Sequence, residues 1–123
     1  MTLKVFLVED SPVIRENLVA AIEEMAPVQV VGFADNASDA MAWIAAHPNG
    51  VDLVVIDLFL RRGSGLDVLR EASPLTDARL VVLSNYATPE MRRKCMELRA
   101  DRVFDKSSEI DALVDYCSRL NNI

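Results

Sequence analysis

The stretch KVFLVEDSP, residues Lys4–Pro12, decides how the rest of this sequence is interpreted. Four apolar residues, Val5–Val8, run directly into two adjacent carboxylates, Glu9 and Asp10. A short apolar run of this kind is typical of a strand that is buried on both faces of a sheet. The serine-proline pair that follows suits a helix N-cap and a first helical residue. The stretch therefore predicts a buried strand that ends in two acids, with a helix starting immediately afterwards.

The same alternation continues along the whole chain. Further apolar runs occur at Val28–Val31, Leu53–Ile56, Leu80–Leu83 and, more weakly, Val103–Phe104. Apolar residues at helical spacing follow each run, within residues 14–25, 40–45, 66–69, 91–98 and 110–120. The expected buried stripes of the first two helices are Ile14, Leu18, Ala21, Ile22 and Met25, then Ala40, Met41, Ile44 and Ala45. Five strand–helix units in succession predict an α/β sandwich with a parallel sheet and right-handed crossovers.

Composition limits the class of protein. The chain has 123 residues, of which 51% are hydrophobic, so we expect one domain with a substantial core over residues 1–123 and no output domain. A net charge of −6 argues against binding to nucleic acid or to a membrane, which favour a basic face. Val5–Val8 is too short for a signal peptide, so we expect a cytoplasmic protein. Cys95 and Cys117 are far apart in sequence, which favours free thiols.

The residues that follow the strands carry the candidate chemistry. In parallel sheets, ligands bind beyond the carboxyl ends of the strands, where the strand order reverses. Glu9 and Asp10 follow the first strand, Asp57 the third, Ser84 the fourth and Lys106 the fifth. Any one of these could be an ordinary helix cap or turn residue. All of them together, on the same edge of one sheet, favour a functional site.

The three carboxylates need a positive partner if the first and third strands are neighbours. Two such charges about 5 Å apart repel by roughly 3 kcal/mol at an effective dielectric near 20. Mg²⁺ takes oxygen ligands from carboxylates and would relieve this repulsion. The lysine and the serine hydroxyl would add donors for an anion. Carboxylates, Mg²⁺, a lysine and a hydroxyl are together the parts of a phosphoryl-transfer site.

Four motifs resemble the receiver domain of two-component response regulators. They are VEDS, VVIDLFLRRGSGLDVL, VVLSN and DKS, and the resemblance extends from Leu3 to Leu120. Gly65, eight residues after Asp57, belongs to the same pattern. The resemblance implies a flavodoxin-like three-layer fold, with five helices around a five-stranded parallel sheet of order 2-1-3-4-5.

The resemblance also implies a role for each site residue. Asp57 would accept a phosphoryl group from a phosphohistidine on a histidine kinase or a histidine phosphotransfer protein. Lys106 would pair with the phosphoryl oxygens, and the hydroxyl of Ser84 would turn toward them in the active state. The implied Mg²⁺ ligands are the side chains of Glu9, Asp10 and Asp57 and the backbone carbonyl of Phe59.

The sequence departs from the usual receiver pattern at several positions. Ser107 follows the lysine where receivers usually have proline, and Arg61 replaces a common proline four residues after Asp57. The residue three before the lysine is typically aromatic, but here it is Val103, with Phe104 one place later and therefore on the opposite face of a strand. Asn85, after Ser84, is larger than the small residue usual there. These departures put the usual coupling between hydroxyl and aromatic side chain in doubt.

We therefore expect a phosphorylation-dependent signalling switch that catalyses only its own phosphorylation and dephosphorylation. Its downstream partner would bind the surface formed by residues 89–98, 103–104 and 110–120. The basic run Arg92–Lys94 in this surface is interpreted as a solvated helix face, with a partner-binding role as the alternative. Two other functions stay open. One is a degenerate receiver that binds proteins independently of phosphate. The other is an aspartate-nucleophile phosphohydrolase, which is disfavoured because Phe59 stands where such enzymes place a second aspartate.

Overall fold

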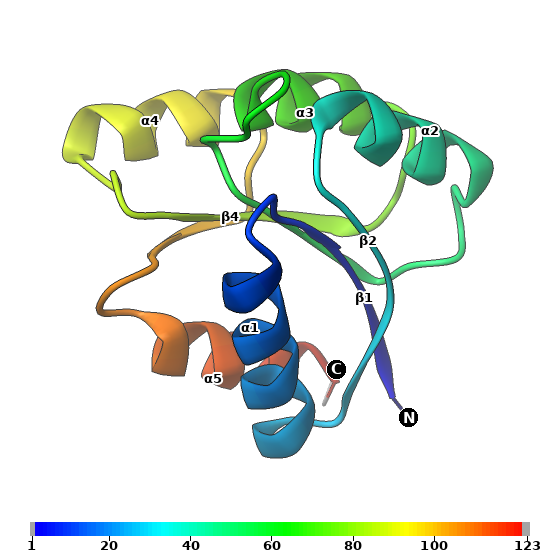
Figure 1. Cartoon of the computed structure of the whole chain (residues 1–123), viewed down its shortest axis with the longest axis vertical. Coiled ribbons are helices and arrows are strands. Elements are labelled where there is room, and N and C mark those ends of the chain that lie inside the picture. Colours follow the sequence, from blue (N-terminus) through cyan, green and yellow to red (C-terminus); the bar gives the residue numbers. More distant parts are fainter. Residues whose placement is uncertain (1, 122–123) are drawn as a thin grey trace.

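A computed structural model describes residues 2–121 and has a parallel sheet between two layers of helices (Figure 1). The strands lie in the order β2-β1-β3-β4-β5, which confirms the predicted topology. The elements in chain order are β1 (Leu3–Val8), α1 (Pro12–Met25), β2 (Val28–Ala34), α2 (Ala37–Ala46), β3 (Leu53–Ile56), α3 (Gly65–Ala72), β4 (Arg79–Ser84), α4 (Pro89–Glu97), β5 (Arg102–Asp105) and α5 (Ile110–Asn121).

Two hydrophobic cores lie on opposite faces of the sheet. Helices α2, α3 and α4 cover one face, and α1 and α5 cover the other (Figure 1). Successive strand residues alternate between these cores, so Phe6 packs in the first and Leu7 in the second. Cys95 is buried in the first core and Cys117 in the second, and both thiols are free, as the sequence predicted.

The predicted burial is correct for the central strands and wrong at the margins. All four residues of β3 are buried, as expected for a strand with neighbours on both sides. Strand β2 lies at the edge of the sheet, and its middle residues are only half-buried. Met25 and Ala45 belong to the predicted helix stripes but are exposed, because each lies in the last turn of its helix, beyond the sheet-facing residues.

Helix caps keep the connections between strands and helices short. The hydroxyl of Ser11 accepts a hydrogen bond from the backbone N–H of Ile14 (3.3 Å), so α1 begins four residues after β1 ends. Thr88 caps α4 in the same way, through the N–H of Met91 (3.2 Å). The acids at the end of β1 and the hydroxyl at the end of β4 are therefore held in short loops.

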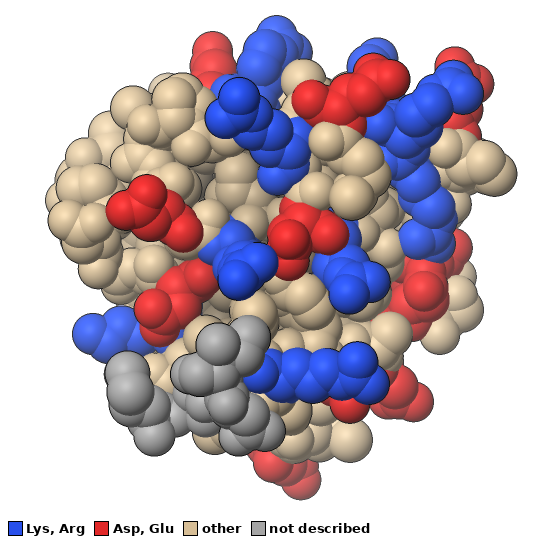
Figure 2. All heavy atoms as spheres, turned by 180° about the vertical axis from the view of Figure 1, so that it is seen from behind, with Lys and Arg blue, Asp and Glu red and all other residues tan. Residues whose placement is uncertain are grey.

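The surface of the described residues carries charges of both signs. Figure 2 shows the molecule from behind, where Lys and Arg side chains are interspersed with Asp and Glu and form no continuous basic area on that face. Among residues 2–121, no helix has the length and apolar character needed to span a membrane.

Candidate functional site

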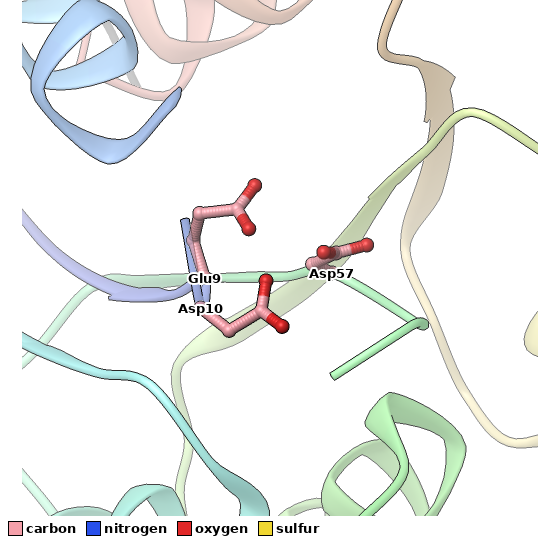
Figure 3. Close-up of side chains that lie close together, drawn as sticks. All are labelled: Glu9, Asp10 and Asp57. Carbon is pink, nitrogen blue, oxygen red and sulfur yellow. The ribbon is translucent and has the colours of Figure 1, made fainter. Parts of the chain in front are cut away.

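The acids at the ends of β1 and β3 lie side by side. The N–H of Asp57 donates to the carbonyl of Val8 (3.0 Å), which continues the pairing of the two strands. Figure 3 shows the carboxylates of Glu9, Asp10 and Asp57 turned toward a common space. One oxygen from each lies within 4.8 Å of the others. The structure therefore brings together the three carboxylates that the sequence analysis proposed as metal ligands.

Backbone N–H groups orient these carboxylates. The N–H of Ser11 donates to Glu9 Oε2 (3.2 Å), and the N–H of Arg61 donates to Asp10 Oδ2 (2.9 Å). The N–H of Phe59 donates to Asp57 Oδ1 (3.3 Å). Because backbone groups of the loops after β1 and β3 hold the acids, the cluster is built into the backbone and is not a chance contact of flexible side chains.

Lys106 supplies the positive charge that faces the acids. Its Nζ lies 2.5 Å from Glu9 Oε1 and 3.3 Å from Asp57 Oδ2. The side chain of Lys106 is 10% exposed, so this pairing takes place largely away from water. Burial alone would lower the pKa of Lys106, but the hydrogen bond to Glu9 and the charge of Asp57 raise it above its ordinary value. Lys106 is therefore protonated beside Asp57 at neutral pH.

The environment of Asp57 shifts its proton affinity. The pKa of Asp57 is raised from 3.8 to about 6, mainly because the carboxyl group is buried. The charge of Lys106 lowers this pKa, whereas the charge of Glu9 raises it. The negative charge of Asp57 is therefore less favourable here than on an exposed aspartate.

Ser84 is connected to Lys106 through the backbone. Its side chain is fully buried, and its Oγ accepts a hydrogen bond from the N–H of Tyr86 (3.0 Å). The N–H of Lys106 donates to the carbonyl of Ser84 (2.9 Å). All the side chains predicted for the site, Glu9, Asp10, Asp57, Ser84 and Lys106, thus follow adjacent strands at one edge of the sheet.

Gly65 allows α3 to begin directly against the segment that follows Asp57. A Cβ at this position would lie 2.1 Å from the carbonyl oxygen of Asp57 and 2.6 Å from Cα of Leu58. Both distances are far below van der Waals contact, and both atoms belong to the backbone. Only glycine therefore permits this approach, which is also fixed by a hydrogen bond from the N–H of Gly65 to the carbonyl of Leu58 (3.1 Å).

Two exposed aromatic side chains lie beside the site. The ring centroids of Phe59 and Tyr86 are 4.8 Å apart in an edge-to-face arrangement. Their exposed fractions are 51% and 61%. Because Phe59 is two residues after Asp57 and Tyr86 is two residues after Ser84, this aromatic pair joins the loop after β3 to the loop after β4.

The residues near the end of β5 that depart from the usual receiver pattern are Val103, Phe104 and Ser107. Val103 packs in the core under α4, whereas Phe104 packs in the other core, with its ring 5.8 Å from that of Tyr116. Phe104 therefore cannot take the place of an aromatic residue at position 103. The turn after β5 is held by Asp105, whose Oδ1 accepts hydrogen bonds from the N–H (2.8 Å) and the hydroxyl (2.5 Å) of Ser107.

Sequence reasoning missed the role of Arg92. It was interpreted as part of a solvated helix face, but its guanidinium donates to the carbonyls of Ala87 (3.0 Å) and Val103 (2.7 Å). It also forms an ion pair with Glu109 (2.6 Å). No local pattern identifies these contacts, because two of the partners are 11 and 17 residues away along the chain. The sequence offers one indication of these contacts, because Arg92 directly follows Met91, which packs on the inner side of α4.

Residues 5–118 match the response regulator receiver domain, so the chain belongs to this family. Receiver domains are signalling modules of two-component systems, and response regulators work with histidine kinases or phosphotransfer proteins. Over 89 residues, or 71% of its length, the chain is 37% identical to the DNA-binding transcriptional activator DevR/DosR of Mycobacterium tuberculosis. It is 26% identical over 107 residues, 86% of its length, to the response regulator UvrY of Escherichia coli K12. The matched parts cover only 40% and 48% of these two relatives.

Solved structures agree with this assignment. The signal receiver domain of the putative response regulator NarL from M. tuberculosis superposes with a TM-score of 0.82 at 26% identity, covering 96% of this chain and 97% of that one. A LuxR-family response regulator from Aurantimonas sp. SI85-9A1 gives a TM-score of 0.84 at 28% identity, covering 94% and 81%. The fold and the family predicted from the sequence are therefore confirmed.

Proposed function

We propose that this receiver accepts a phosphoryl group on Asp57 in a Mg²⁺-dependent reaction. The observation that carries the proposal is the convergence of three carboxylates within 4.8 Å, with the ammonium of Lys106 3.3 Å from Asp57. An oxygen of Asp57 attacks the phosphorus of a phosphohistidine. The P–N bond breaks, its electron pair stays on the imidazole nitrogen, and an aspartyl phosphate forms. Lys106 then pairs with the phosphoryl oxygens, and the Ser84 hydroxyl rotates to donate to them.

The donor set suits Mg²⁺. Carboxylate oxygens are the ligands that a hard divalent cation prefers, and Glu9, Asp10 and Asp57 offer one each at suitable spacing. The backbone carbonyl of Phe59 is the fourth protein ligand in this proposal. When bound, Mg²⁺ would neutralise the carboxylates and the charge of the phosphoryl oxygens, which lets a carboxylate and a phosphate approach each other.

The phosphodonor partner needs a surface next to Asp57. A groove of about 360 Å³ lies between α1 and α5, lined by apolar residues such as Ile14, Leu18 and Ile110 together with Lys106. Ile14 is 37% exposed there and Val13 beside it is 67% exposed. We propose that a helical kinase or phosphotransfer domain docks on this groove and brings its histidine to Asp57.

The downstream protein is proposed to bind the surface formed by α4, β5 and α5. This surface contains a hollow of about 640 Å³ whose lining includes Met96, Arg102, Tyr116 and Arg119. Mixed basic and apolar lining of this kind suits a protein segment more than a small metabolite. We further propose that the protein acts in the cytoplasm, without binding nucleic acid or membrane through these residues.

Incubation with acetyl phosphate, with and without Mg²⁺, tests this function. A phosphoacceptor gains the mass of one phosphoryl group only with Mg²⁺ and releases inorganic phosphate slowly afterwards. A phosphohydrolase would release phosphate over many rapid turnovers, and a phosphate-independent binding module would gain no mass under either condition. Absence of any Mg²⁺-dependent mass gain would overturn the proposal.

A further inference from the structure

The side chain of Arg92 connects three separate segments of the chain. Its Nε donates to the carbonyl of Ala87 in the loop between β4 and α4 (3.0 Å). One terminal nitrogen donates to the carbonyl of Val103 in β5 (2.7 Å), and the other contacts Glu109 Oε1 before α5 (2.6 Å). Arg92 itself belongs to α4. One guanidinium thus joins α4 to the loops that follow β4 and β5.

These two loops carry the groups proposed to contact the phosphoryl oxygens. Ala87 lies three residues after Ser84, and Glu109 lies three residues after Lys106. Glu109 Oε1 also accepts a hydrogen bond from the N–H of Asp105 (2.9 Å), the residue directly before Lys106. A displacement of either Ser84 or Lys106 toward a phosphoryl group therefore moves a hydrogen-bond partner of Arg92.

Position 103, where receivers usually carry an aromatic residue, is one of the contacts of Arg92. Val103 is too small to follow a movement of Ser84, and Phe104 packs on the other face of the sheet. The carbonyl of Val103 instead holds the guanidinium by a short hydrogen bond. A planar group with donors in fixed directions transmits displacement better than a flexible ammonium group would.

We propose that Arg92, positioned by Glu109, couples phosphorylation of Asp57 to helix α4 in this protein. The proposal rests on the function proposed above. When Ser84 and Lys106 move toward the phosphoryl group, the carbonyl of Ala87 and the carboxylate of Glu109 shift, and Arg92 carries that shift into α4. The pair contributes little to stability, because the two side chains are 38% and 34% exposed, so its main effect is on this coupling.

Nuclear magnetic resonance with beryllofluoride and Mg²⁺, which mimic an aspartyl phosphate, tests the proposal. In the wild type we expect amide shifts at Asp57, in the loop after Ser84 and throughout Pro89–Glu97. In Arg92→Gln the shifts near Asp57 remain, while those of α4 fall to less than half their wild-type size. Arg93→Gln is the matched control, since it removes the same charge from an exposed neighbour on the same helix, and it should respond like the wild type.

Two further variants make the result decisive. Glu109→Gln should also reduce the amide shifts of α4. If Arg92→Gln fails to fold, Glu109→Gln tests the coupling in its place. Arg92→Lys keeps the charge but not the three directed donors, so it should resemble Arg92→Gln. Amide shifts of α4 as large in Arg92→Gln as in the wild type would overturn the coupling. If Arg92→Gln does not fold, the same result in Glu109→Gln would overturn it. A wild type without any shifts, even at Asp57, would instead overturn the proposed function on which this inference depends.

Discussion

At the scale of single residues, the environment of Asp57 is defined by burial and by two neighbouring charges. Its pKa is raised to about 6 mainly through burial, with Glu9 adding to the shift and Lys106 opposing it. The carboxylate repulsion expected from the sequence is therefore real but secondary to the loss of solvent. A group that is costly to ionise in the folded state gains most from a bound cation, which is consistent with a metal-assisted phosphoacceptor.

Stability without metal should depend on pH through Asp57. Because the folded pKa of about 6 exceeds the ordinary value of 3.8, the folded state binds this proton more tightly. The resulting stabilisation is complete below about pH 4 and is lost as the pH rises through 6, so the free energy of unfolding should fall across this window. Asp57→Asn should remove this dependence and raise the free energy of unfolding by about 1–2 kcal/mol at neutral pH.

Urea denaturation in the presence of a metal chelator, from acidic to neutral pH, measures this effect. Asp52→Asn is the control, because Asp52 is exposed at the opposite end of the same strand and accepts a hydrogen bond from the N–H of Lys4. A wild type whose stability rises with pH over the same window, while Asp57→Asn does not differ from it, would contradict the assignment.

The aromatic pair Phe59 and Tyr86 should lengthen the lifetime of the aspartyl phosphate. Neither a phenyl ring nor a phenol offers a basic atom that takes a proton from an attacking water. Their rings pack edge to face in the loops that follow Asp57 and Ser84, so we expect them to hinder an attacking water. Phe59→Asn with Tyr86→Glu should speed hydrolysis about tenfold, which corresponds to roughly 1.4 kcal/mol of barrier.

First-order loss of phosphate after removal of the donor, with Mg²⁺ present, is the measurement for this pair. Leu75→Asn is a suitable control, because Leu75 is an exposed apolar residue (43%) in the loop before β4, at the opposite end of the sheet from the acids. Equal lifetimes for the wild type and the double variant would show that water access is limited by something other than these rings.

At the scale of helices and strands, the sequence predicts most of the fold because most elements have a strong local signal. The run Leu53–Ile56 is uninterrupted and matches β3 at both ends. Ser11 and Thr88 mark the starts of α1 and α4, each followed by proline. Met25 and Ala45 were predicted wrongly because periodicity does not show where a helix leaves the sheet. Which turn of a helix extends beyond the sheet depends on tertiary packing, and a short window of sequence carries no information about that packing.

The candidate site likewise has residues that the sequence predicts and contacts that it does not. Its five side chains could be predicted because strand ends in a parallel sheet necessarily share one edge. The contacts of Lys106 with Glu9 and of Arg92 with Glu109 could not, because they join side chains 97 and 17 residues apart. The family pattern identifies Lys106, whereas Arg92 fits no motif and its contacts are seen only in the three-dimensional structure.

Gly65 is an element-scale constraint that a single methyl group can test. The Cβ of Gly65→Ala would lie 2.1 Å from the carbonyl oxygen of Asp57, so either α3 or the segment that follows Asp57 must shift. We expect the free energy of unfolding to fall by about 2–3 kcal/mol, as in other overpacked sites, and phosphorylation to slow. Gly50→Ala is the matched control, because its Cβ would meet only the side chain of His47, at 3.2 Å. Equal urea midpoints for the two variants would contradict the close approach.

At the scale of the whole molecule, binding of Mg²⁺ should stabilise the fold by mass action. The ion binds carboxylates that only the folded chain brings together, so an ion at 100 times its Kd adds about 2.7 kcal/mol to the free energy of unfolding. The Tm should rise by several degrees with Mg²⁺. The rise should be much smaller in Asp10→Asn, although Asp10→Asn should melt above the wild type without metal. A Tm that is insensitive to Mg²⁺ in the wild type would argue against the metal site.

These effects of burial, charge and metal all converge on Asp57, and intact mass tests that convergence most directly. Wild type, Asp57→Asn and Asp52→Asn are each incubated with acetyl phosphate and Mg²⁺. We expect a gain of one phosphoryl group in the wild type and in Asp52→Asn, and no gain in Asp57→Asn. Full phosphorylation of Asp57→Asn at the wild-type rate would contradict it, because the acceptor would then be another residue.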